Sequence, residues 1–186
     1  MKILGKRKID KDFLEISISE LFSITGGVIA GLFLAKIINN IGLLGGLFIL
    51  FPGLLELHGN IYGSLSARLG NLLLLGKLKK KGELKYFLKE NIIAVLFLII
   101  FVSFILGLIA YLSIYLFFGI NNYSIIFIAV LSSLISSVFE IPLTTYTTLW
   151  IFRHKLDPED IMGPYVTTVG DIISILSLML VTFLLI

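Results

Sequence analysis

Three carboxylates stand inside long apolar segments of the sequence: Glu56, Glu140 and Asp171. Each lies roughly 20–25 Å along its predicted helix, at about 1.5 Å per residue, so none is at an obvious membrane interface. A charged group at membrane depth costs about 2.5–3.5 kcal/mol on insertion scales and usually marks an ion path, a proton relay or a buried pair. These residues could attract a cation or exchange a proton. Taken alone, Glu56 or Glu140 could equally be a protonated, hydrogen-bonded structural group.

Each carboxylate belongs to a polar stripe with the three- or four-residue spacing of one helix face. The stripes are Glu56, Asn60, Ser64 and Arg68; Glu140, Thr144 and Thr148; and Gly163, Thr167, Asp171 and Ser174. Because lipid offers no hydrogen bonds to such a face, the stripes are expected to face one another or a water-filled path. Arg68 is expected to be a counter-ion to an acid or to reach the inner interface.

The available ligand types favour hard cations. Pro52, Pro142 and Pro164 lie near the carboxylates, and a proline inside a helix frees a backbone carbonyl, as in the broken helices that form ion sites in transporters. The chain has no cysteine, and His58 and His154 lie in different segments, so zinc, copper and iron sites are disfavoured. Mg²⁺, Ca²⁺, Mn²⁺ and Na⁺ remain. Mg²⁺ suits a sparse set of acids best, because it keeps most of its waters and needs only one or two carboxylates.

The composition is that of an integral membrane protein. Of the 186 residues, 58% are hydrophobic and 15% are charged, against about 45–50% and about 25% in soluble domains. This balance excludes a disordered chain and a nucleic-acid-binding tail, and it argues against a soluble enzyme, because too little polar surface is available to cover the core. No enzyme activity is expected, since no paired nucleophile and base are evident.

An all-α fold with five transmembrane helices is predicted, roughly at residues 20–38, 41–76, 90–117, 123–152 and 158–185. Residues 91–139 contain no Asp, Glu, Lys or Arg and would be about 73 Å long as one helix. That stretch must therefore turn once, at residues 118–122 (Phe-Gly-Ile-Asn-Asn). Asn39 and Asn40 mark another turn, and Asp157 and Pro158 fit the start of the last helix. The second span is expected to be one kinked helix or two pieces around a proline.

The basic residues predict the orientation. Thirteen of the 15 Lys and Arg residues lie within residues 1–11, within residues 77–89, or at Arg153 and Lys155. The alternate connections contain none, which places the N-terminus in the cytoplasm and the C-terminus outside. Residues 1–19 are predicted to form a cytosolic or interfacial amphipathic segment, and residues 20–186 a five-helix domain that crosses the cytoplasmic (plasma) membrane several times. The basic segments are expected to contact lipid headgroups rather than nucleic acid. Small residues expected to allow close helix packing are Gly26, Gly27, Gly31, Gly59 and Gly63.

Two segments resemble the membrane domain of the MgtE family of magnesium transporters and of its eukaryotic solute-carrier relatives. Residues 52–60 (Pro-Gly-Leu-Leu-Glu-Leu-His-Gly-Asn), with Ala-Arg-Leu at 67–69, are similar to the proline, leucines and Gly-Asn of the family's second helix. Residues 157–160 (Asp-Pro-Glu-Asp), Pro164 and residues 167–171 (Thr-Thr-Val-Gly-Asp) resemble its fifth helix, whose threonine-rich run ends in a pore aspartate. Bacterial members usually have Gly-Gly-Asn where this chain has His-Gly-Asn.

The resemblance implies a homodimer, with the cation path between or within its five-helix halves. It also implies that Asp171 holds a hydrated Mg²⁺ and that Asn60 lies near the same path. Bacterial members carry an acidic domain and a nucleotide-sensing CBS pair before the membrane part. Only residues 1–19 precede the first predicted span here, so a stand-alone half without cytosolic regulatory domains is expected.

The sequence therefore predicts a divalent cation transporter or channel for a partly hydrated ion, with Mg²⁺ preferred and Mn²⁺ or Ca²⁺ as alternatives. The predicted metal-contacting residues are Asp171, Asn60, Thr167, Thr168, Glu56 and Glu140. In this mechanism the aspartate attracts the ion, the threonines and the asparagine hold its waters, and the glutamates add negative potential or relay protons. Two alternatives remain: a membrane scaffold or accessory subunit with structural buried acids, and a proton- or sodium-coupled carrier of a small solute.

Overall fold

The computed structural model describes residues 2–38, 45–78 and 80–185, with side chains for residues 13–32, 46–78, 80 and 82–185. These residues form five helices and no strand. The helices are α1 (Lys2–Ile38), α2 (Gly45–Leu74), α3 (Lys81–Phe118), α4 (Ser124–Arg153) and α5 (Pro158–Leu185). The predicted all-α architecture is therefore confirmed for the described part of the chain.

Two helix ends form as their sequences predict. After α3, Gly119 adopts the left-handed backbone conformation (φ +67°), and the Asn122 side chain then accepts a hydrogen bond from the backbone N–H of Ser124 at 3.0 Å. Before α5, the Asp157 carboxylate accepts a hydrogen bond from the backbone N–H of Glu159 at 2.9 Å, which makes it the N-cap. The predicted turn at residues 39–40 lies outside the described residues.

Two helix boundaries differ from the sequence prediction. Helix α1 runs without a break through residue 20, because residues 6–25 contain no Gly, Pro or Asn that could end it. Within α1, the Glu15 carboxylate accepts a hydrogen bond from the backbone N–H of Asp157 at 3.5 Å, so this part of α1 also packs on the protein. Helix α3 begins at Lys81 rather than near residue 90. At this start the Glu83 carboxylate accepts a hydrogen bond from the backbone N–H of Lys80 at 3.1 Å.

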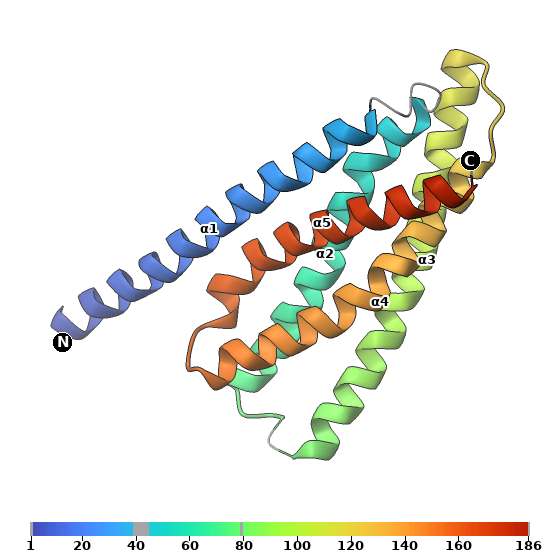
Figure 1. The fold of residues 1–186 in the computed structure, drawn as a ribbon. Coiled ribbons are helices and arrows are strands. Elements are labelled where there is room, and N and C mark those ends of the chain that lie inside the picture. The colour runs from blue at the N-terminus through green and yellow to red at the C-terminus, as the bar shows by residue number, and fades with distance from the viewer. Residues whose placement is uncertain (1, 39–44, 79, 186) are drawn as a thin grey trace.

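Helix α5 is one of three helices, with α2 and α4, that each pack against three others. It packs against α1, α2 and α4, while α3 packs against α2 and α4, and α2 also packs against α4 (Figure 1). Among the described residues, α1 packs only against α5. The N-terminus and the connections that follow α2 and α4 lie at one end of the molecule, and the C-terminus and the α3–α4 connection lie at the other (Figure 1). The basic segments are thus gathered at one end, although the assignment of that end to the cytoplasm stays a prediction.

Four segments of the described chain are long and apolar enough to cross a membrane: Phe13–Leu32, Gly82–Phe118, Ser124–Arg153 and Pro158–Leu185. Helix α2 is not among them, because its polar stripe and His58 lower its hydropathy. It is nevertheless a single helix through Pro52, so the alternative of two separate pieces is excluded. The chain is an integral membrane protein, and the fifth crossing, by α2, stays a prediction.

The buried core has two apolar layers. One contains Leu50 and Leu54 of α2, and the other contains Tyr62 and Leu65 of the same helix. His58 lies between these layers and is itself 2% exposed. A buried polar level therefore separates the two apolar layers.

The glycines have different roles in packing. A Cβ atom added at Gly26 would overlap the Thr168 side chain, so this glycine permits the α1–α5 contact. Among the described residues of one copy, Gly27, Gly31 and Gly63 have no atom within 4 Å of such a Cβ, so their predicted role in close packing stays a prediction. The closest approach to a neighbouring backbone is instead at Gly107 of α3, where a Cβ would lie 2.8 Å from the Ile126 Cα atom.

We expect Gly107→Ala to destabilise the protein by about 1–3 kcal/mol, because the added methyl group meets backbone that cannot rotate away. Gly27→Ala is the matched control and should not lower stability, since its methyl group enters open space and alanine favours the helix. Thermal unfolding in detergent, followed by circular dichroism, measures both variants. An unchanged unfolding midpoint for Gly107→Ala would contradict the close α3–α4 packing.

Candidate functional site

A cavity of about 390 Å³ lies between α2 and α5. Its walls bring together four of the six residues predicted from the sequence to contact a metal. From α2 it is lined by Pro52, Leu55, Glu56, Gly59, Asn60 and Gly63, and from α5 by Gly163, Thr167 and Asp171. Two of the three polar stripes therefore face a common space, as their helical spacing predicts.

Helical periodicity and small residues explain why the cavity exists. Glu56 and Asn60 are one turn apart on α2, and Thr167 and Asp171 are one turn apart on α5, so each pair projects from one side of its helix. The space between them stays open because glycines contribute no side chains to the walls. At Gly63, for example, a Cβ atom would have no neighbour within 4 Å.

The polar side chains in the cavity present acceptor oxygens. The Asn60 amide donates a hydrogen bond to the Glu56 carboxylate at 2.9 Å, so the carbonyl oxygen of the Asn60 side chain stays available as an acceptor. The Thr167 hydroxyl donates to the backbone carbonyl of Gly163 at 3.2 Å, which leaves its oxygen lone pairs available. Glu56, Asn60 and Thr167 are exposed, and Asp171 is half-buried. Carboxylate, amide and hydroxyl oxygens are the donor types that hard cations and their waters prefer.

Two of the six predicted residues lie elsewhere. Thr168 is 2% exposed and packs on Gly26 of α1, and its hydroxyl donates to the backbone carbonyl of Pro164 at 2.8 Å. Glu140 is 3% exposed and lies in a buried polar cluster rather than in the cavity wall. Neither side chain lines the α2–α5 cavity.

Four side chains from three helices form this buried cluster: His58, Ser136, Glu140 and Ser174. The Glu140 Oε1 atom lies 3.3 Å from His58 Nδ1, and it accepts hydrogen bonds from Ser136 and, at 3.3 Å, from Ser174. His58 and Ser174 also share a hydrogen bond. Ser136 is not among the residues predicted from the sequence, although it extends the Glu140 stripe by one turn. The pairing of His58 with Glu140 is also not predicted, because no local spacing signals it.

Arg68 lines a second cavity, of about 260 Å³, between α2 and α3. It shares this cavity with Asn60, Ser64 and Asn91. Within the described part of the chain, no ion pair joins Arg68 to a carboxylate, so the predicted counter-ion role is not found there. The acids of the α2–α5 cavity are thus not neutralised by this arginine.

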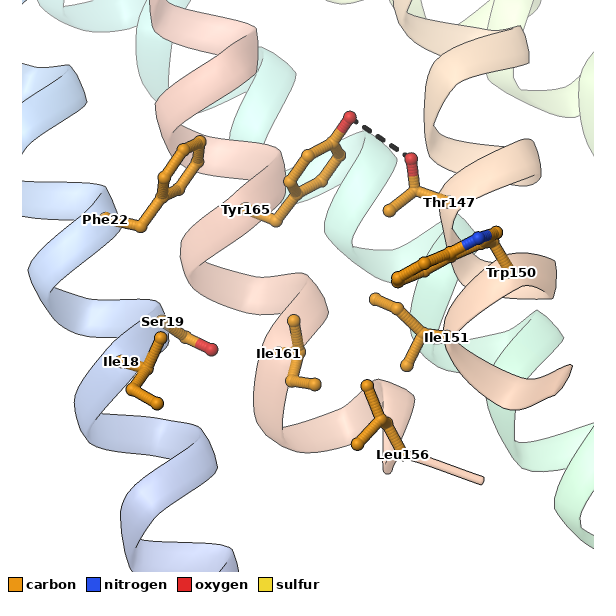
Figure 2. Close-up of a pocket in the computed structure, with 9 residues that line it drawn as sticks. All are labelled: Ile18, Ser19, Phe22, Thr147, Trp150, Ile151, Leu156, Ile161 and Tyr165. Carbon is orange, nitrogen blue, oxygen red and sulfur yellow. Dashed lines mark hydrogen bonds between the residues drawn. The ribbon is translucent and has the colours of Figure 1, made fainter. Parts of the chain in front are cut away.

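A third cavity, of about 330 Å³, lies between α1, α4 and α5 and is shown in Figure 2. Apolar side chains such as Phe22 and Ile161 form most of its wall, and none of its lining residues is charged. Its main polar contact is a hydrogen bond of 3.1 Å from the Thr147 hydroxyl to the Tyr165 hydroxyl, drawn as a dashed line in Figure 2. This cavity lacks the charge needed to attract a cation.

Comparison with curated proteins and with solved structures gave no match. A family model for MgtE, described as a divalent cation transporter, matches residues 51–181. The matched segment includes every residue that lines the α2–α5 cavity and all four residues of the buried cluster. The family is one of transporters rather than of enzymes. Because the match covers more than half of the chain, this protein belongs to the MgtE family of divalent cation transporters.

Proposed function

We propose that this chain carries Mg²⁺ across the cytoplasmic membrane as a partly hydrated ion that passes through the α2–α5 cavity. The observation that carries the proposal is the meeting of Glu56 and Asp171, from two different helices, at one cavity in which the other polar groups present acceptor oxygens. Two carboxylates match the charge of a divalent ion. The family membership supports a divalent cation as the transported species.

The size of the cavity supports a hydrated ion. Mg²⁺ prefers six ligands and gives up its waters reluctantly. The cavity, of about 390 Å³, has room for an ion together with several waters, since one water needs only about 10–15 Å³ of such space. In this mechanism Asp171 and Glu56 attract the ion, while Asn60 and Thr167 accept hydrogen bonds from its waters. Thr168 and Glu140 have no direct contact with the ion.

A homodimer would complete the path. The α2 stripe of Glu56, Asn60 and Ser64 is exposed in one copy, and so is Thr167 of α5. Hydrocarbon cannot hydrogen-bond to such a surface. In a dimer with two-fold symmetry, this surface of one copy would face the same surface of the second copy. A polar path would then lie between the two copies. The path would run from the basic end of the molecule, assigned to the cytoplasm, to the opposite side.

Asp171→Asn should lower Mg²⁺ uptake at least about tenfold, because it removes the charge that attracts the ion and a charge-assisted hydrogen bond to its waters. The matched control is Glu159→Gln, which makes the same chemical change at an exposed position in the first turn of α5. Uptake into proteoliposomes that contain a Mg²⁺-sensitive dye measures both variants. Asp171→Ala should likewise abolish uptake while leaving the dimer folded. Wild-type uptake by either Asp171 variant would exclude the proposed role.

Millimolar Mg²⁺ should raise the unfolding midpoint of the wild-type protein. At 100 times the dissociation constant, bound Mg²⁺ should add about 2.7 kcal/mol to the free energy of unfolding. Asp171→Asn should lose most of this stabilisation. Thermal unfolding at constant ionic strength, with Mg²⁺, Ca²⁺, Mn²⁺ or Na⁺, measures the effect. A scaffold protein would respond to none of these ions, and a sodium-coupled carrier would respond to Na⁺.

The dimer predicts a specific cross-link. Because the chain has no cysteine, Ser64→Cys places a single thiol on the exposed α2 stripe. This thiol should face the same thiol of the second copy. Phe97→Cys is the control, since Phe97 is 68% exposed on α3, away from the cavity. A cysteine-reactive bifunctional reagent should give a covalent dimer with the first variant and not with the second. Equal cross-linking of both variants would argue against this interface.

A further inference from the structure

The buried cluster lies beside the α2–α5 cavity, behind its α2 wall and one turn farther along its α5 wall. His58 is two residues from both Glu56 and Asn60, and two residues turn a helix by about 200°, so it projects from the opposite side of the same turns. Ser174 is three residues after Asp171, on the next turn of α5. The side chains that form the cavity and those that form the cluster therefore share the same two stretches of helix.

Helix α4 connects these two stretches. Its Glu140 carboxylate faces His58 of α2 at 3.3 Å and accepts a hydrogen bond from Ser174 of α5, also at 3.3 Å. Ser136, one turn earlier on α4, donates to the same carboxylate. The exposed fraction of these four side chains is 3% or less. Buried polar groups of this kind tolerate only arrangements that keep their hydrogen bonds, because an unpaired group in low dielectric is costly.

The carboxylate also contacts the backbone beside Asp171. A Cβ atom added at Gly170 would lie 3.1 Å from Glu140 Oε2, so the carboxylate rests against the α5 turn that carries the aspartate. Above and below this level α2 and α5 meet through apolar layers, and the nearby hydrogen bonds between helices, Ser66 with Thr148 and Thr147 with Tyr165, each involve α4. Apolar contact is non-directional and does not by itself fix how α2 and α5 are rotated or spaced. The directional contacts at this depth come from the cluster.

We propose that His58, Ser136, Glu140 and Ser174 are positioning residues that fix the spacing of α2 and α5, and with it the fit of the cavity to one hydrated divalent ion. The part of this inference that concerns the ion rests on the proposed function. The part that concerns helix spacing does not. Loss of one cluster hydrogen bond loosens the walls, weakens the capture of Mg²⁺ and reduces discrimination between Mg²⁺ and the larger Ca²⁺.

Matched serine substitutions test the transport effect. Ser174→Ala and Ser136→Ala each remove a hydroxyl from the cluster. Ser177→Ala and Ser132→Ala remove equally buried hydroxyls from the same helices outside it; Ser132 donates to its own helix, at the Ala129 carbonyl. The half-saturating Mg²⁺ concentration in proteoliposomes should rise about fivefold in the cluster variants, as expected for one net hydrogen bond, with a smaller preference for Mg²⁺ over Ca²⁺. The controls should stay within twofold of the wild type. A purely structural role would instead lower folded protein and the flux of both ions equally.

Helix spacing can be measured without transport. In the cysteine-free chain, Ile49→Cys on α2 and Leu176→Cys on α5 place spin labels at exposed positions outside the cavity. Labelled protein diluted with unlabelled chain gives the distance within one copy by pulsed electron paramagnetic resonance. The distance distribution should be narrow in the wild type and in Ser177→Ala, and broader or shifted in Ser174→Ala and Ser136→Ala.

The outcomes separate the two proposals. Unchanged distances and unchanged half-saturation in both cluster variants would overturn the positioning role. If the cluster variants change the distances while Asp171→Asn still transports normally, the cation path is wrong and the spacing role stands. If one cluster variant does not fold, the other gives the same comparison with its own control.

Discussion

An ionised carboxylate is stable at membrane depth only where water, hydrogen-bond donors or a cation replace the hydration that it has lost. The three deep acids of this chain meet that requirement in two ways. Glu56 and Asp171 line a cavity of about 390 Å³, while Glu140 is enclosed by His58 and two serine hydroxyls. The first arrangement leaves oxygen atoms available to a passing ion. The second uses one oxygen, Glu140 Oε1, to join helices.

This division accounts for the way the bundle is built. Helix α5 contacts three other helices and carries both kinds of site on neighbouring sides. Helix α2 carries so many polar groups that its sequence alone does not qualify as a membrane span. It is held instead by packing against α3, α4 and α5. The more apolar α3 has an outer face of large exposed side chains, Phe97 and Phe101 among them, which suits contact with lipid.

Helical spacing predicted much of the cavity, because Glu56 with Asn60 and Thr167 with Asp171 are each four residues apart. Spacing identifies a face of one helix but not the neighbour that this face will meet. Thr168 shows the consequence: it follows Thr167 by one residue, about 100° around the helix, and packs on α1 instead of the cavity. The His58–Glu140 pair joins residues far apart in the sequence and depends on the rotation of α2 against α4. Such rotations arise from packing across the whole bundle, and no local pattern contains them. Turn chemistry, by contrast, is local, and Gly119 and Asp157 ended and began their helices as predicted.

The central claim is that a divalent ion occupies the space between α2 and α5. Anomalous diffraction from crystals grown with Mn²⁺, recorded at an energy where manganese scatters anomalously, tests it most directly. The account predicts a peak inside the α2–α5 cavity, next to Asp171 and on the side that faces Asn60, that disappears when excess Mg²⁺ is added. A cavity without a peak, in crystals where manganese is bound only at surface acids such as Glu159, would contradict it.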